Sequence, residues 1–194
     1  MTPILLWDVM STLVHDPFFE EMPEFFGVSF EELIQTLKPG PWVEFELGLR
    51  SETEFLDDFF ADGRRFDQQG FVEQVRGAYR WLPGMEGLLS ELHAEGFSMH
   101  AFSNYPEWYR MIEERLELSR FASWTFVSCR MELRKPDAAA YQHVLERLGV
   151  PAERCLFIDD RSNNCEAARR AGIPSIQFDG VESLRRSLGE RGVF

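Results

Sequence analysis

Five short apolar runs are distributed along the chain. They cover residues 4–7, 97–102, 124–127, 155–158 and 175–178. Runs of this length favour buried strands over helices, because a helix normally needs ten or more residues to bury a face. The runs therefore predict five strands.

Helical patterns lie between the later runs, at residues 87–94, 105–116, 136–148 and 163–171. Pro136 opens one of them, and Gly149 and Gly172 follow the last residues of two, which is typical start and stop chemistry. Strands that alternate with helices indicate a parallel sheet with helices on both faces. The fold class we predict is α/β, a Rossmann-like doubly wound parallel sheet.

The stretch between the first two apolar runs has a different pattern. Three groups of aromatic and aliphatic residues at helical spacing, within residues 25–37, 55–60 and 71–75, predict three amphipathic helices and no strand. Leu82-Pro83-Gly84 then forms a turn signal. We predict a helical insertion over residues 17–81 and an α/β core built from residues 1–16 and 82–194.

Composition narrows the functional classes. Hydrophobic residues make up 44% of the 194 residues and the formal net charge is −13, which predicts a globular protein without a basic nucleic-acid face. No apolar run is long enough to span a bilayer, and no leader pattern follows Met1, so we expect a cytoplasmic protein. Three cysteines without paired spacing favour free thiols. The pattern leaves the oligomeric state open.

Polar side chains follow four of the predicted strands. In a doubly wound sheet the carboxyl ends of the strands meet at one edge, where ligands bind. Carboxylates, one ammonium group, a hydroxyl and an amide gathered there would suit a divalent cation and phosphoryl transfer. These residues are Asp8, Ser103-Asn104, Lys135 and Asp159-Asp160.

Four segments in this order resemble the motifs of the haloacid dehalogenase superfamily. Each segment alone is a weak signal, but four in order at strand ends are a strong one, and the resemblance covers nearly the whole chain. Glu46-Leu47-Gly48 and Glu54-Phe55 also resemble the helical cap that one subgroup carries between its first two motifs. The four segments are Leu5-Leu6-Trp7-Asp8-Val9-Met10-Ser11-Thr12-Leu13, Phe102-Ser103-Asn104, Lys135-Pro136-Asp137 and Phe157-Ile158-Asp159-Asp160 continued to Asn164.

The resemblance implies a phosphatase of a small phosphorylated metabolite. Asp8 would be the nucleophile and form an aspartyl-phosphate. Mg²⁺ would be held by Asp8, the main-chain carbonyl of Met10 and Asp160, with Asp159 assisting through water.

The remaining motif residues would bind and support. Ser103 and the Asn104 amide would bind phosphoryl oxygens, and Lys135 would neutralise the negative charge gathered around the nucleophile. Thr12 in the first motif and Asn164 in the fourth would have supporting roles, the latter by orienting the fourth motif or Lys135.

One position departs from the family pattern. Phosphatases of this superfamily usually have a second aspartate two residues after the nucleophile as general acid and base, and here that residue is Met10. Loss of such a group costs roughly 10²–10⁴-fold in rate. His15 is the substitute acid nearest in sequence.

Three functional hypotheses follow from this departure. The favoured one is a Mg²⁺-dependent phosphatase that either is slow without the usual acid or uses another acid. The second is a binding or regulatory protein on a retired catalytic fold. The third is a metal-free dehalogenase with Asp8 as nucleophile, although the paired acids Asp159-Asp160 favour a metal.

Overall fold

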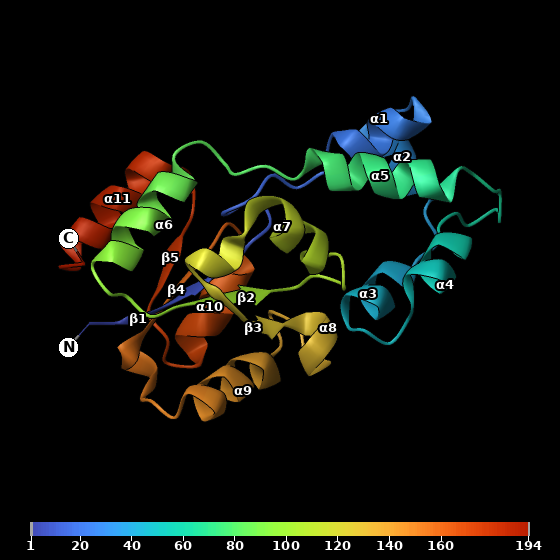
Figure 1. The fold of residues 1–194 in the computed structure, drawn as a ribbon. Coiled ribbons are helices and arrows are strands. Elements are labelled where there is room, and N and C mark those ends of the chain that lie inside the picture. The colour runs from blue at the N-terminus through green and yellow to red at the C-terminus, as the bar shows by residue number, and fades with distance from the viewer. Residues whose placement is uncertain (1, 194) are drawn as a thin grey trace.

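The computed structural model describes residues 2–193 and confirms the α/β fold class (Figure 1). Five parallel strands form one sheet in the order β3-β2-β1-β4-β5. The strands are β1 (Ile4–Trp7), β2 (Met99–Ser103), β3 (Ser123–Val127), β4 (Cys155–Asp159) and β5 (Ser175–Gln177). All five coincide with the apolar runs to within two residues at either end.

Helices cover both faces of the sheet. They are α6 (Met85–Ala94), α7 (Tyr109–Leu116), α8 (Ser128–Met131), α9 (Ala138–Leu148), α10 (Ser162–Arg170) and α11 (Val181–Glu190), with the short 3-10 turns η1 (Leu118–Arg120) and η2 (Ala152–Arg154). The apolar pattern did not predict α8 or α11. The sequence also predicted that α7 begins at Tyr105, but Pro106 disfavours helix at the residue before it, and the Tyr105 N–H donates to the Ser128 Oγ instead.

The alternation of side chains along the strands divides the interior into two cores. Leu5 and Trp7 of β1 face the core shared with α6, α7 and α11, while Leu6 faces the core shared with α9 and α10. β4 divides in the same way, because successive residues of a strand point to opposite faces. The result is a three-layer structure whose central strand, β1, is buried from Leu5 to Trp7.

Residues 17–81 contain five helices rather than three, and no strand. They are α1 (Glu21–Phe26), α2 (Phe30–Thr36), α3 (Pro41–Glu46), α4 (Glu52–Asp57) and α5 (Gln68–Ala78). Ser29 and Ser51 each begin a helix with a complete capping box, in which the side chain of Glu32 or Glu54 closes back on the cap. The additional helices are short, and their caps rather than their periodicity mark them.

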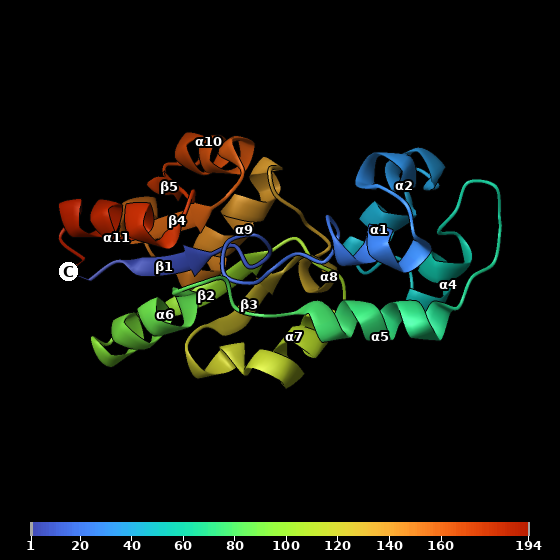
Figure 2. The same cartoon turned by 90° about the horizontal axis from the view of Figure 1, so that it is seen from above.

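This helical insertion lies beyond the carboxyl ends of the strands (Figure 2). Two chain segments connect it to the core and run side by side. The His15 N–H donates to the Arg80 carbonyl at 2.9 Å, and the Leu82 N–H donates to the Leu13 carbonyl at 2.9 Å. The sheet edge where the polar residues were predicted to meet therefore faces the insertion. Over residues 2–193, no helix combines the length and the apolar composition that crossing a membrane requires.

Candidate active site

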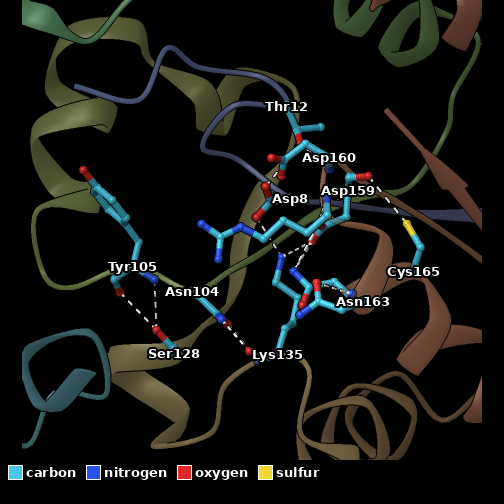
Figure 3. A network of polar contacts seen from close by, with 12 residues as sticks. Asp8, Thr12, Asn104, Tyr105, Ser128, Lys135, Asp159, Asp160, Asn163 and Cys165 are labelled. Atoms are coloured by element: carbon cyan, nitrogen blue, oxygen red, sulfur yellow. Dashed lines mark hydrogen bonds and ion pairs between the residues drawn. The ribbon is translucent and has the colours of Figure 1, made fainter. Parts of the chain in front are cut away.

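Lys135 bridges two buried carboxylates at the carboxyl edge of the sheet (Figure 3). Its Nζ lies 2.7 Å from Asp8 Oδ1, directly after β1, and 2.7 Å from Asp159 Oδ2, at the end of β4. Only 1% of the lysine is exposed. Burial disfavours its charged form, but the two carboxylates outweigh burial and raise the pKa of Lys135, so the ammonium persists.

The environment of Asp8 disfavours the charged form of its carboxyl. Burial raises its pKa from 3.8 to about 7, and the negative charges of Asp159 and Asp160 act in the same direction against the opposing charge of Lys135. Its second oxygen, Oδ2, accepts a hydrogen bond from Thr12 Oγ1 at 3.2 Å. Both oxygens of Asp8 therefore have a donor, and the carboxylate is held in one orientation.

Asp159 is held by a separate set of donors. The Asn164 side chain donates to its two oxygens at 3.1 and 3.0 Å, and the Arg161 N–H donates to Oδ1 at 2.8 Å. Asn164 thus acts on Lys135 indirectly, by fixing the carboxylate that the ammonium contacts. Thr12 also accepts the Asp160 N–H at 3.2 Å and so ties the loop after β1 to the loop after β4.

The two residues at the end of β2 have different surroundings. The Asn104 side chain makes two hydrogen bonds to the main chain of Lys135, donating to its carbonyl at 2.7 Å and accepting from its N–H at 2.8 Å. These two bonds hold the Asn104 side chain against the loop that carries Lys135. Ser103 is buried, and within the described residues its hydroxyl has no hydrogen-bond partner. An unpaired buried hydroxyl is a ready donor for an anionic oxygen.

Three carboxylates could hold a cation. One oxygen each from Asp8, Asp159 and Asp160 lie within 4.8 Å of one another. Burial raises the pKa of Asp160, and the charge of Asp159 adds to this effect. Hard divalent cations prefer such oxygen ligands, and a cation would relieve the mutual repulsion. The donor set therefore fits Mg²⁺.

A cleft of about 230 Å³ opens above this cluster. Asp8, Lys135 and Asp160 line its inner end, and Phe18 and Trp42 bring the helical insertion into its wall. The complete lining is Asp8, Met10, Ser11, Asp16, Phe18, Trp42, Glu46, Asn104, Tyr105, Arg134, Lys135, Asp160, Arg161 and Asn164. Among the sequence-predicted site residues, Ser103, Thr12, Asp159 and His15 lie outside this lining.

The placement of His15 speaks against it as the substitute acid. Its Nε2 lies 2.7 Å from Glu21 Oε2, at the start of α1, and the ring does not line the cleft. The next residue, Asp16, does line the cleft. Of these two neighbours, therefore, Asp16 is the one in contact with the cleft.

A partly buried ion pair between insertion and core was also not predicted. Arg134 Nε donates to Glu46 Oε1 at 2.8 Å, and Trp42 Nε1 donates to the other oxygen at 3.2 Å. The Ser128 hydroxyl donates to the Glu46 carbonyl at 2.5 Å. The sequence of Glu46-Leu47-Gly48 resembles a cap segment, but no local pattern predicts its contacts with Ser128 and Arg134, more than 80 positions away.

Comparison with known proteins agrees with this geometry. Residues 5–172 match the model of the haloacid dehalogenase-like hydrolase family. The chain is 46% identical over 191 residues to Flavin mononucleotide hydrolase 1 of Arabidopsis thaliana, covering 98% of this chain and 78% of that protein. It is 28% identical over 158 residues to a sesquiterpene phosphatase of Aspergillus oryzae, covering 78% of this chain and 79% of that protein.

Among solved structures, a haloacid dehalogenase family enzyme from Bacteroides thetaiotaomicron, in complex with magnesium and inorganic phosphate, has the same fold. It superposes with a TM-score of 0.74 at 19% identity and covers 91% of this chain and 94% of its own. The match of motifs, fold and sequence places this chain in the haloacid dehalogenase-like hydrolase family.

Proposed function

We propose that this hydrolase is a Mg²⁺-dependent phosphatase that acts through an aspartyl-phosphate on Asp8. The observation that carries the proposal is the position of Lys135, which is buried between Asp8 and Asp159 at the inner end of an open cleft. A cation fixed there can stabilise the charge of a transferring phosphoryl group, and preorganised charge is usually the largest contribution to such a reaction.

Lys135, Thr12, Ser103 and Asn104 would each have a separate role in the reaction. Lys135 and Thr12 hold the two oxygens of Asp8, so the nucleophile meets the phosphorus in a fixed orientation. The unpaired Ser103 hydroxyl can donate to a phosphoryl oxygen. The Asn104 side chain keeps the Lys135 loop in place through its two main-chain hydrogen bonds.

Asp8, Asp160 and the main-chain carbonyl of Met10 would hold Mg²⁺, and Asp159 would assist through water. When bound, the ion neutralises phosphoryl oxygens and lowers the cost of charge at the transition state. The carboxylates of Asp8, Asp159 and Asp160 all belong to the α/β core, and none belongs to the insertion. We propose that residues 17–81 form a cap, whose contribution is the outer wall of the cleft.

The substrate we propose is flavin mononucleotide. The named activity of the Arabidopsis relative suggests it, and the aromatic wall of the cleft supports it. The rings of Phe18 and Trp42 are nearly parallel, at 15°, with centroids 6.5 Å apart, and Tyr105 packs against Trp42 at 6.1 Å. A planar ring system is well suited to stacking on such a surface. Cytoplasmic location also stays a prediction, since that relative is named as chloroplastic.

The test is release of riboflavin and inorganic phosphate from flavin mononucleotide, with Mg²⁺ and with a chelator. We expect Mg²⁺-dependent turnover that Asp8→Asn abolishes and that the control Asp179→Asn, at an exposed position, leaves intact. Equal hydrolysis by Asp8→Asn would overturn the mechanism. Halide release from a 2-haloacid in the presence of chelator would instead assign dehalogenase chemistry to Asp8.

A further inference from the structure

The loop after β1 folds back on itself beside Met10. The Ser11 N–H donates to the Val14 carbonyl at 2.8 Å, the Val14 N–H donates to the Val9 carbonyl at 2.9 Å, and Met10 pairs with Val14. Ser11 takes a left-handed conformation, with φ of 57°, to close this turn. The chain that leaves the turn therefore starts next to the position where the acid is missing.

Asp16 is two residues beyond Val14, or about 7 Å along an extended chain. Residues 13–15, just before Asp16, pair with residues 80–82 through two hydrogen bonds and a bridge between Val14 and Trp81. Asp16 lines the same cleft as Asp8 and Met10. Asp16 is thus part of the same cleft that would hold a phosphate ester bound at Asp8.

The Asp16 carboxyl is free to exchange a proton. In the described part of the chain its one hydrogen bond comes from the Phe18 N–H, at 3.0 Å to Oδ1. No lysine or arginine over residues 2–193 lies within 4.0 Å of it to form an ion pair. The second oxygen, Oδ2, is thus without a protein partner, unlike either oxygen of Asp8.

The groups around Asp16 have opposing effects on its charge. Burial raises the pKa of Asp16, and Asp160 adds to this, while the Phe18 N–H, Arg161 and His15 act against it. Tyr105 lines the same cleft, and its hydroxyl and that of Tyr79 hydrogen-bond to each other at 2.8 Å. A carboxyl with a raised pKa gives and takes protons more readily near neutral pH.

We propose that Asp16 is the acid–base catalytic residue of this hydrolase, in place of the group that Met10 cannot supply. This inference rests on the proposed phosphatase function and names the residue that transfers the proton.

Asp16 would give a proton in the first step of the reaction and regain one in the second. An Asp8 oxygen forms a bond to phosphorus while the bond from phosphorus to the ester oxygen breaks, and the Asp16 carboxyl gives its proton to that oxygen, releasing the alcohol. The Asp16 carboxylate then takes a proton from water as the water oxygen attacks phosphorus. The bond from phosphorus to Asp8 breaks, phosphate leaves, and both residues return to their starting state.

The first test compares leaving groups in Asp16→Asn. An alkyl ester such as flavin mononucleotide needs the proton, so we expect its kcat to fall roughly 10²–10⁴-fold. p-Nitrophenyl phosphate needs no acid, so its first step should persist while hydrolysis of the aspartyl-phosphate slows. The expected result is a burst of one p-nitrophenol per enzyme followed by slow turnover. A general loss of structure would instead lower the rates of both steps. The absence of a burst would contradict the proposal.

Two further variants sharpen the test. Met10→Asp in the Asp16→Asn background should restore turnover of flavin mononucleotide, because it returns an acid to the neighbouring position. His15→Gln, next in sequence but outside the cleft, should lower kcat for flavin mononucleotide far less than Asp16→Asn does. Failure of the Met10→Asp rescue, or an equal loss in His15→Gln, would overturn the assignment of Asp16.

The two proposals fail in different ways. If the unaltered protein turns over phosphate esters and Asp16→Asn matches it on flavin mononucleotide, the role of Asp16 is wrong and the phosphatase function stands. If the unaltered protein and Met10→Asp both lack Mg²⁺-dependent turnover, the phosphatase function fails and takes this inference with it.

Discussion

Replacing Asp8 with asparagine should make the metal-free protein more stable at neutral pH while it abolishes turnover. The carboxyl of Asp8 is held in a buried position where its charge is disfavoured, because burial and two neighbouring carboxylates outweigh the one ammonium of Lys135. Asparagine has nearly the same shape, can still accept the Lys135 hydrogen bond, and carries no charge to bury.

The magnitude follows from the pKa. The pKa of Asp8 is raised from 3.8 to about 7, a difference of about three pH units, and each unit corresponds to about 1.4 kcal/mol. The folded state therefore binds more protons than the unfolded chain between about pH 4 and 7, and stability falls as the pH rises through that range. Above about pH 7 the full penalty of about 4 kcal/mol is present, and it is the upper limit of the gain in Asp8→Asn.

Urea denaturation in a chelating buffer at pH 8 and at pH 5 measures this effect. We expect Asp8→Asn to unfold at a higher urea concentration than the unaltered protein at pH 8, and the difference to shrink at pH 5. Added Mg²⁺ should then stabilise the unaltered protein more than the variant, since it binds the folded state through Asp8. If the variant is the less stable protein at pH 8 without metal, the charge of Asp8 is compensated and the reasoning is refuted.

Three other substitutions test the site and its wall. Lys135→Met leaves two buried carboxylates without a cation and should cost about 3–5 kcal/mol in urea denaturation at pH 8, with a smaller cost at pH 5; a cost that does not vary with pH would contradict this. Gly48→Ala should lower the melting temperature more than the matched Gly63→Ala. Both glycines have φ near 70°, but only at Gly48 would the new Cβ lie 2.3 Å from the Cys129 carbonyl oxygen. Equal losses in the two variants would show that the Cys129 carbonyl moves aside without cost. Phe18→Leu should raise KM for flavin mononucleotide by about tenfold and leave KM for glycerol phosphate unchanged, because it removes a stacking ring but keeps an apolar side chain; equal changes for the two substrates would rule out stacking.

The core fold was largely predictable because its signals are local. A short apolar run that ends in an acid, such as Ile4–Trp7 before Asp8, marks both a buried strand and its functional end. Parallel topology then brings such ends together without further information. The same reasoning did not include α11, although its apolar residues Val181, Leu184 and Leu188 stand at helical spacing in an otherwise polar stretch.

The amino-acid sequence by itself determined the order of strands and helices, the carboxylates and lysine of the site, and the family to which they belong. Only the tertiary structure decided which side chains face the cleft. Of the neighbours His15 and Asp16 only Asp16 lines the cleft, and the chain just before them, at residues 13–15, pairs with residues 80–82, more than sixty positions away. Such long-range contacts have no local pattern, because they form when two surfaces meet and not when one segment folds.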